Sequence, residues 1–397
     1  MTIPPQTLHG LFRRFLGFGL LAWGGPVAQI AMLRRELVER EAWISSERFN
    51  RTLAVYQVLP GPEAHELCVY FGYVARGRIG GLVAGLGFML PGFVLVLVAA
   101  WFYLSVGVDS PFFGAAFAGC QAAVLALIVR AVHRIGAHAV TDAWLGLIVF
   151  VAFTASLLGI GFAVILAAAG ATYFVIARSR RVTRLAATTL LATGLLVAGS
   201  ASNAQPPTPA SFEQEVRALR QPTLPEMTLS GLRAGLLTFG GAYTAIPIVQ
   251  RDAVDDGRWM TTPTFLDGVA LSGILPAPLI IFTAFVGFIA GGLMGATAMT
   301  IGVFAPAFAF TLVGHRHLER LVEHPGAHAV LDGITAGVVG LIAATAVLLM
   351  PVVIRGPASI VILVLALAAL YLWRSSAVVA AVVLGAAALG LVFFDGL

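Results

Sequence analysis

Residues 57–66 read QVLPGPEAHE, and this stretch decides the fold together with its counterpart at 273–282, GILPAPLIIF. Pro60-Gly61-Pro62 interrupts a hydrophobic run that extends from about 53 to 74. Proline and glycine cost a helix interior about 3 and 1 kcal/mol, and the backbone groups that they free need partners in protein, water or ligand. The pattern therefore predicts that one helix ends near Leu59 and that another begins at Glu63.

The two stretches belong to an internal repeat. A shift of 216 positions places Gly24-Gly25 on Gly240-Gly241 and Arg35 on Arg251. Fourteen of the 44 positions from 19 to 62 are then identical, against roughly one in ten expected by chance for so biased a composition. We therefore expect two homologous halves.

The composition excludes a soluble globular protein. Of the 397 residues, 59% are hydrophobic and only 11% are charged, against roughly 25% charged in an ordinary soluble domain. So much apolar surface must face lipid, and each spanning helix needs about 20 apolar residues. We expect an all-α integral membrane protein with about 13 hydrophobic segments, near 15–33, 53–74, 79–104, 112–132, 143–158, 160–177, 185–201, 232–250, 264–289, 291–313, 328–350, 358–373 and 377–394.

The charged residues and cysteines point to no further function class. The net charge is +5, and every basic residue is an arginine placed between hydrophobic segments, as in the loops that orient membrane proteins. No basic patch suggests a nucleic acid partner. Cys68 and Cys120 lie in apolar stretches without a CxxC spacing, so we expect neither a disulfide framework nor a thiolate metal site.

Parity predicts how the halves are oriented. The first half has six hydrophobic runs and the run at 185–201 makes a seventh, so the second half enters the membrane from the opposite side. Such an inverted repeat is typical of secondary transporters, whose substrate site lies near the midplane where the halves meet. We assign 10–177 to the first repeat, 178–228 to a linker with one hydrophobic segment and a proline-rich polar loop, and 229–394 to the second repeat.

The arginines refine this topology. If the first two runs each cross the membrane, the arginines between 34 and 51 lie outside, against the rule that positive loops face the cytoplasm. The conflict disappears if these runs, and their counterparts in the second half, are re-entrant hairpins broken at 24–26 and 60–62. A kinked helix that spans the membrane is the alternative.

The breaks are the predicted anion site. A helix that begins after a break offers free N–H groups and the positive end of its dipole. Arg35 and Arg251 suit oxyanions because a planar guanidinium binds two oxygens at once. A packing kink and interfacial ion pairs are the alternative interpretations. These patterns predict the following substrate-binding residues: Gly24, Gly25, Pro26, Arg35, Pro60, Gly61, Pro62, Gly240, Gly241, Arg251, Pro276 and Pro278.

Ionisable groups near the breaks are candidates for proton coupling, because such groups are costly inside a membrane. Glu63 and His65 follow the proline break, and Glu36 follows Arg35. No spacing of histidine, cysteine or carboxylate residues favours a metal site, and no nucleotide-binding or hydrolase motif is present. We expect no metal, no cofactor and no enzymatic activity.

Taken together, the motifs resemble the chromate transporter family, whose long members carry two copies of one domain. The residues that carry the resemblance are Trp23-Gly24-Gly25-Pro26, Arg35-Glu36, Trp43-Ile44-Ser45, Gln57-Val58-Leu59-Pro60-Gly61-Pro62 and Gly72-Tyr73. The resemblance adds Gln57 and Gln29 to the candidate site; Gln29 stands where the family commonly has histidine.

The resemblance implies a secondary transporter of the inner cell membrane that exports chromate and so confers chromate resistance. Sulfate, a dianion of nearly the same shape, is the alternative substrate, and a permease for another solute or an integral-membrane enzyme are the competing functions. The partners implied are chromate or sulfate and membrane lipid, without nucleic acid; whether the chain forms a homodimer stays open.

Overall fold

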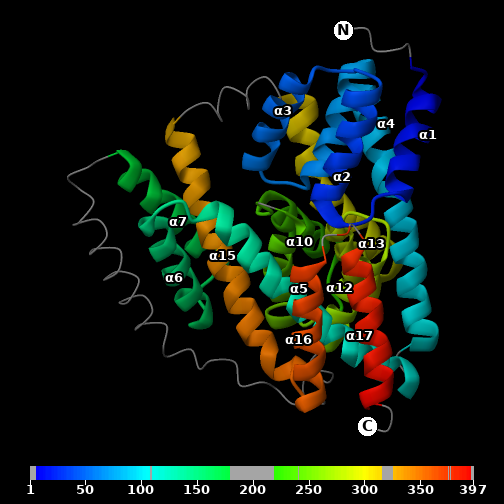
Figure 1. The fold of residues 1–397 in the computed structure, drawn as a ribbon, viewed down its shortest axis with the longest axis vertical. Helices are drawn as coiled ribbons and strands as arrows, with labels where there is room; N and C mark the ends of the chain where they lie inside the picture. Colours follow the sequence, from blue (N-terminus) through cyan, green and yellow to red (C-terminus); the bar gives the residue numbers. More distant parts are fainter. Residues whose placement is uncertain are drawn as a thin grey trace. The chain divides into compact units, whose positions relative to one another are not determined.

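The computed structural model describes residues 6–107, 110–178, 219–239, 241–314, 325–373, 375 and 377–394. These residues form helices and no strands (Figure 1). The first repeat contains α1 (Leu8–Leu20), α2 (Gly25–Leu33), η1 (Arg34–Arg40), α3 (Ser46–Val58), α4 (Glu63–Phe102), η2 (Tyr103–Gly107), α5 (Pro111–Ala139), α6 (Ala143–Leu157) and α7 (Phe162–Arg178). The second contains α10 (Leu224–Leu236), η3 (Ala242–Thr244), α11 (Ala245–Gln250), η4 (Arg251–Asp255), α12 (Thr262–Ile274), η5 (Leu279–Ile281), α13 (Phe282–Ala309), η6 (Phe310–Gly314), α15 (Pro325–Val353), α16 (Pro357–Leu372) and α17 (Val378–Phe394).

Helix starts recur at equivalent positions of the two repeats because the capping residues recur. The Thr7 hydroxyl caps α1 and the Thr223 hydroxyl caps α10, 216 positions later. In the same way the Ser45 hydroxyl accepts the third backbone N–H of α3, and Thr261 does so in α12. Such caps stabilise a helix by about 1 kcal/mol each. The sequence repeat is therefore also a repeat of local structure.

The predicted breaks in the first two hydrophobic runs are confirmed. α3 ends at Val58 and α4 begins at Glu63, and α1 and α2 are separated by a turn that ends at Gly24. Gly24 and Gly25 have φ of 84° and 76°, values that favour glycine. Each run is therefore divided between two helices and does not form one continuous spanning helix.

The start of α1, the residue after η1 and the turn inside α4 lie on one face of the first unit, which we call the N-terminal face. The Arg14 guanidinium, on α1, pairs with Glu41, after η1, and holds the pKa of that carboxyl below its usual range. Arg76, within α4, donates a hydrogen bond of 2.7 Å to the carbonyl oxygen of Gln6. Figure 1 shows α1, α2 and α3 gathered at the end marked N.

The long helix α4 is itself a hairpin. At Arg76 and Gly77 the backbone leaves the helical region, with a φ of 63° at Gly77. The two legs then lie so close that a Cβ at Gly72 would be 2.4 Å from the carbonyl oxygen of Gly80. α13 turns in the same way at Gly291 and Gly292.

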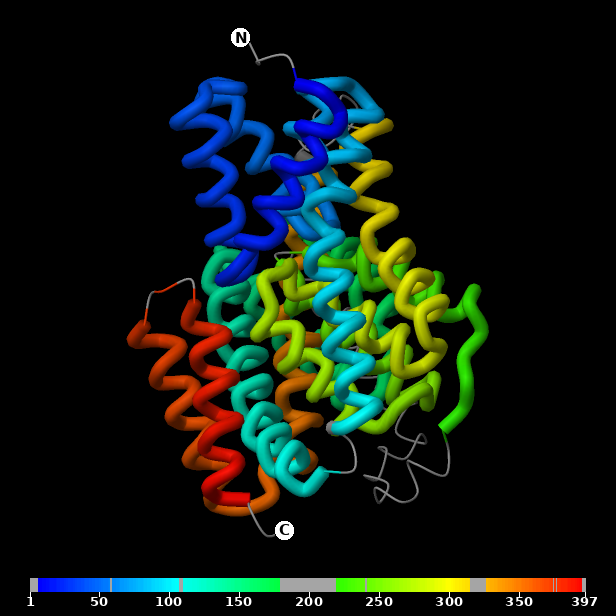
Figure 2. The backbone as a smooth tube through the Cα atoms, turned by 90° about the vertical axis from the view of Figure 1, so that its right-hand side faces the viewer, coloured from blue at the N-terminus to red at the C-terminus, as the bar shows by residue number. Residues whose placement is uncertain are grey.

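The second legs of these two hairpins pack against each other in opposite directions. Gly81 lies against Leu312 and Gly85 against Phe308, so the sequence numbers rise along one leg as they fall along the other. Figure 2 shows the two legs, cyan and yellow, running past each other. Equivalent elements of an inverted repeat must have this antiparallel relation.

The chain is a multi-pass membrane protein. Among the described residues, four helices are long and apolar enough to cross a membrane, and four shorter apolar helices accompany them. The four long ones are Glu63–Val106, Pro111–Ala139, Leu279–Gly314 and Gly326–Val353. The prediction of 13 segments is not confirmed: the first two runs of each half are split, and the run at 185–201 lies outside the described residues.

The chain forms two compact units, and each contains parts of both repeats. The first unit comprises Met1–Leu127, Ala218–His315 and Val352–Leu397; the second comprises Ile128–Arg217 and Arg316–Pro351. In the first unit, Gly119 of α5 packs on Ala386 and Gly390 of α17. In the second unit the equivalent Gly333 of α15 packs on Ala169 and Gly170 of α7. In each unit, a helix of one repeat therefore packs against a helix of the other repeat.

Replacing Gly72 with alanine tests the α4 hairpin. The added methyl would overlap the Gly80 carbonyl and the Ala84 side chain, and overpacking of this kind costs about 1–3 kcal/mol. We expect a lower temperature of thermal unfolding in detergent for Gly72→Ala. Gly17→Ala is the matched control, since nothing lies within 4 Å of a Cβ there, and we expect it to be neutral or slightly stabilising. Equal unfolding temperatures for the two variants would contradict the hairpin packing.

Candidate functional site

The helix breaks of the two repeats meet inside the first unit. The backbone N–H of Gly61 donates a hydrogen bond of 2.8 Å to the carbonyl oxygen of Thr238, between α10 and η3. A Cβ at Gly92, on the second leg of α4, would be 2.5 Å from that of Ala277 in the break between α12 and η5. Segments that are 177 and 185 residues apart in sequence therefore share one region.

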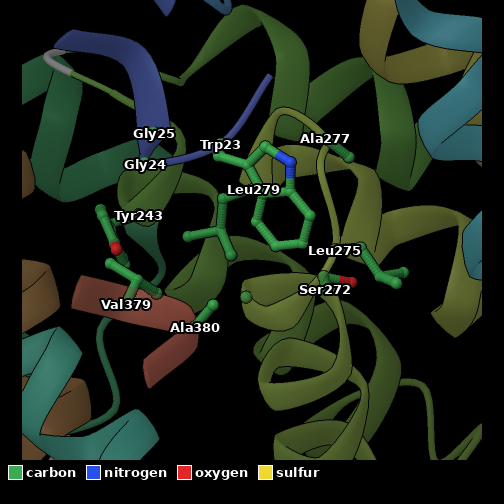
Figure 3. Close-up of a pocket in the computed structure, with 11 residues that line it drawn as sticks. Trp23, Gly24, Gly25, Tyr243, Ser272, Leu275, Ala277, Leu279, Val379 and Ala380 are labelled. Atoms are coloured by element: carbon green, nitrogen blue, oxygen red, sulfur yellow. The ribbon is translucent and has the colours of Figure 1, made fainter. Parts of the chain in front are cut away.

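A small, partly open pocket lies at this junction. Three segments at or next to helix breaks line it: Trp23 with Gly24 and Gly25, Tyr243 of η3, and the segment from Ser272 to Leu279. Val379 and Ala380 of α17 complete it. Figure 3 shows the Trp23 indole lying across the pocket beside Leu279, with the two glycines on one side and Ser272 on the other.

Two helix N-termini, one from each repeat, border the pocket without side-chain caps. α2 begins at Gly25, and its N-cap residue, Gly24, has no side chain to accept the first N–H groups. η5 begins at Leu279 after Pro278 and continues into α13, again without a side-chain cap. Uncapped N-termini present N–H donors and positive partial charge. This part of the pocket wall therefore favours an anion.

The side chains that line the pocket carry no formal charge. Ser272 is 2% exposed, and its hydroxyl has no hydrogen-bond partner among the described residues. Trp23 and Tyr243 add an indole N–H and a phenol to the lining. Since a buried polar group without a partner is unfavourable, a ligand that accepts a hydrogen bond from Ser272 gains affinity. An anion held here is bound by neutral donors and helix ends.

The structure brings only some of the predicted site residues to this pocket. Gly24 and Gly25 line it directly, whereas Pro276 and Pro278 alternate with its lining residues Leu275, Ala277 and Leu279. Gly240 lies outside the described residues. The remaining residues of the breaks are Pro26, the second residue of α2, Gly241, the residue before η3, and Pro60, Gly61 and Pro62, between α3 and α4.

The two predicted arginines lie elsewhere and have acidic partners. The Arg35 side chain is 67% exposed, and its Nε lies 3.3 Å from the Glu36 carboxylate, which also pairs with Arg40. Arg251 lies 3.1 Å from Asp256 and is 28% exposed. Neither lines the pocket. Their role in substrate binding stays a prediction, and the pocket's own donors are backbone and neutral side chains.

The two glutamines differ in their surroundings. Gln29 of α2 is buried, and its amide donates a hydrogen bond of 2.9 Å to the Ala22 carbonyl oxygen in the break before α2. Gln57, near the end of α3, is exposed. Gln29 therefore holds the first break together rather than facing the pocket, and neither glutamine is among its lining residues.

Three ionisable residues lie in the first turn of α4. Glu63 is partly exposed, whereas His65 and Glu66 are fully buried. The His65 ring packs between Phe304 and Phe308 of α13, with centroid distances of 4.7 and 4.8 Å. Glu66 instead lies beneath the break, where a Cβ at Gly61 would be 2.7 Å from its carboxyl oxygen Oε1.

Sequence reasoning missed a buried polar cluster around Asp267 of α12. Tyr103 donates a hydrogen bond of 2.9 Å to one oxygen of this carboxylate, and Gln121 of α5 donates one of 2.8 Å to the other. Arg355 in turn donates to the Gln121 carbonyl at 3.2 Å. The carboxylate is thus satisfied by residues from distant parts of the chain. The one feature of the sequence that pointed to Asp267 was its position in a hydrophobic run, because the matching residue of the first repeat is not acidic and Asp267 belongs to no known motif.

The pocket-lining residues Tyr243 and Ser272 were missed as well. Both are ordinary in sequence, since they match Val27 and Tyr56 in the first repeat. The signal available was their proximity in sequence to Gly241 and Pro276. Among the described residues, no group of three or more histidine, cysteine or carboxylate side chains is placed to hold a metal ion.

Comparisons with known proteins identify close relatives. The family model described as Chromate transporter matches residues 9–175 and again 225–391. The chain is 52% identical to the chromate transport protein of Pseudomonas aeruginosa over 395 residues, which cover 98% of this chain and 94% of that protein. It is 30% identical to the chromate transport protein of Cupriavidus metallidurans, with 88% and 84% covered, and 28% identical to a probable chromate transport protein of Synechococcus elongatus, with 87% and 85% covered. No solved structure matches.

The variant Ser272→Ala tests whether the pocket binds oxyanions. A hydrogen bond to a charged partner contributes about 1.5–3 kcal/mol, so we expect an affinity for a tetrahedral oxyanion that is about 10- to 150-fold lower. Thermal stability without ligand should not fall, because the hydroxyl has no partner to lose. The measurement is equilibrium binding by calorimetry in nanodiscs.

Thr228→Ala, which removes an exposed hydroxyl bonded to its own helix, is the control and should bind normally. Unchanged affinity in Ser272→Ala would place the oxyanion elsewhere.

Proposed function

The chain belongs to the chromate transporter family, and from this premise we propose that it is a secondary transporter that exports chromate across the inner cell membrane and so confers chromate resistance. The observation that carries the proposal is the pocket at which uncapped helix N-termini of both repeats meet. Transporters built from inverted repeats bind substrate where broken helices of the two halves meet. The relatives that are named for a function are transport proteins, in agreement with this proposal.

Chromate fits the chemistry of the pocket. It is a tetrahedral dianion with four oxygen acceptors, and the pocket offers helix N–H groups together with hydroxyl and indole donors. A site without arginine or lysine binds a dianion less tightly than a salt bridge would, which favours release on the far side. Sulfate has the same charge and shape, and competition measures how well the site separates the two.

We also propose that the repeats are inverted across the membrane and that the broken runs are re-entrant hairpins. The antiparallel second legs of α4 and α13 support inversion. The N-terminal face carries the arginines of α1, η1, α3 and the turn at Arg76, so it is the cytoplasmic face by the positive-inside rule. The hairpins put all these arginines on one side, and the conflict found in the sequence then disappears.

The membrane potential supplies a driving force for export. A bacterial cytoplasm is electrically negative, and moving one charge across 100 mV is worth about 2.3 kcal/mol. Two charges leaving as the dianion therefore gain roughly 4.6 kcal/mol per 100 mV. Export needs no nucleotide hydrolysis on this account.

Transport into everted membrane vesicles tests the function. Energised vesicles are positive inside, so we expect accumulation of labelled chromate that an ionophore abolishes and that excess sulfate reduces. Gly61→Val should abolish accumulation, since Gly61 has a φ of 147° and a Cβ there meets Glu66. Gly17→Ala should transport normally. No accumulation above vesicles that lack the protein, at normal expression, would refute chromate export.

Cysteine labelling tests the topology. In a background with Cys68→Ala and Cys120→Ala, we expect an impermeant maleimide on intact cells to label Leu293→Cys and not Arg78→Cys, since both positions are exposed and border the two equivalent turns. Everted vesicles should give the reverse pattern. Labelling of both positions from one side would contradict the inversion.

Labelling at the exposed position Glu47 distinguishes re-entrant hairpins from helices that cross the membrane. If the first two runs re-enter, Glu47→Cys is labelled with Arg78→Cys from the cytoplasm. If they cross the membrane, Glu47→Cys is labelled from outside.

A further inference from the structure

The carboxyl group of Glu66 lies inside the protein without a partner. Its exposed fraction is 0%, and neither oxygen has a hydrogen-bond partner among the described residues. An ionised carboxylate in such a place is strongly unfavourable, because neither a donor nor a cation offsets the loss of hydration. The group is therefore neutral in this conformation and ionises only when its surroundings change.

Glu66 is aimed at the break that precedes its own helix. A Cβ at Gly61 would be 2.7 Å from Oε1 of Glu66. Gly61 in turn donates its backbone N–H to the Thr238 carbonyl, in the segment that leads to Tyr243 of the pocket. The N-terminus of α4, after Pro62, has no side-chain cap. The titratable carboxyl group of Glu66 therefore lies next to the place where the two repeats contact each other.

The charged groups around Glu66 do not neutralise it. Glu63, one turn earlier on α4, adds a like charge. The elements α2, η5, α13 and η6, which pack against α4, carry no ionisable side chain. Most ionisable groups on the other neighbouring elements pair with other residues: Arg14 of α1 with Glu41, Arg48 of α3 with Tyr70, Arg51 with Glu47, and Asp267 of α12 with Tyr103 and Gln121. The remaining ionisable residues of these elements are His9, Arg13 and Tyr56.

We propose that Glu66 is the proton-binding group of the anion site, so that the site admits a dianion when Glu66 is protonated, and proton and oxyanion bind together. The proposal rests on the proposed function and names its coupling residue. Like charges in a medium of low dielectric repel, so an ionised Glu66 excludes the dianion and a neutral one permits it. Where the free site has lost its proton, the carboxyl O–H bond forms with a proton from solvent as the dianion enters, and the same bond breaks as the dianion leaves.

The linkage has a definite sign. If one proton binds with each dianion, the affinity is greatest at low pH and falls by up to tenfold per pH unit once the free site has lost its proton. Sulfate is the suitable probe between about pH 5 and pH 9, because it stays a dianion throughout, whereas chromate takes up a proton near neutrality. Chromate is used above about pH 8 for comparison.

The experiment measures sulfate and chromate affinity by calorimetry on the full chain in nanodiscs. We expect wild-type affinity to fall as pH rises and the affinity of Glu66→Gln to be independent of pH. Glu63→Gln is the matched control, one turn away, and should keep a pH-dependent affinity. At pH values where the wild-type affinity falls about tenfold per pH unit, titrations in two buffers of different ionisation enthalpy should show uptake of about one proton per dianion by the wild type and none by Glu66→Gln.

Two results would overturn the proposal while leaving the anion site intact: a pH dependence in Glu66→Gln equal to that of the wild type, or a wild type that takes up no proton on binding at any pH between about 5 and 9. The second needs no variant, so it decides the matter even if Glu66→Gln fails to fold. Failure of the wild type to bind either oxyanion at any pH would instead refute the proposed function, and the coupling proposal with it.

Discussion

Lipid offers no hydrogen bonds, so every backbone N–H and C=O in a bilayer must find a partner within the protein or its ligand. This chain breaks its helices at four places and must satisfy the freed groups. It does so by bringing breaks of both repeats together: the Gly61 N–H meets the Thr238 carbonyl, and the Gln29 side chain meets the Ala22 carbonyl. The N–H groups that remain at the starts of α2 and η5 border the pocket. The pocket and the hydrogen bonds that satisfy the broken helices thus belong to one arrangement.

The breaks and the repeat could be predicted from the sequence because proline, glycine and capping residues act locally. Pro60-Gly61-Pro62 gave the end of α3 and the start of α4 to within one residue, and the 216-residue shift also relates the caps Thr7 and Thr223. A turn between the runs 53–74 and 79–104 was predicted, and the structure has one at Arg76 and Gly77, but how tight this turn is was not predicted. Arg76 and Gly77 lie in a charged stretch that looks like an ordinary loop, and only the close packing of Gly72 on Gly80 turns the second leg back along the first.

The candidate site was less predictable because it depends on contacts between distant residues. Gly24 and Gly25 were found since their conformation demands glycine, but Tyr243 and Ser272 carry no sequence signal and line the pocket only through the fold. The role of the two arginines stays a prediction, because it rests on their recurrence alone. Arg35 and Arg251 recur in both halves, and each pairs with an acidic residue close to it in sequence, Glu36 and Asp256 respectively. A repeated charge pattern therefore indicates repeated structure before it indicates a binding site.

The two repeats are similar in backbone and different in chemistry, so the pocket is not symmetric between them. Behind the first-repeat break stands Glu66, whereas the second repeat has Phe282 at the matching position and Ala277 where the first has Gly61. A perfectly symmetric pair of hairpins would offer the same site to both sides of the membrane. With one ionisable group on one hairpin, the two access states differ in charge. If a proton accompanies the dianion, one net negative charge crosses the membrane, so the potential still favours export, by roughly 2.3 kcal/mol per 100 mV, while the pH gradient opposes it. In the proposed mechanism the balance of these two forces sets how far the dianion is moved, and Glu66 is the residue that makes the balance depend on pH.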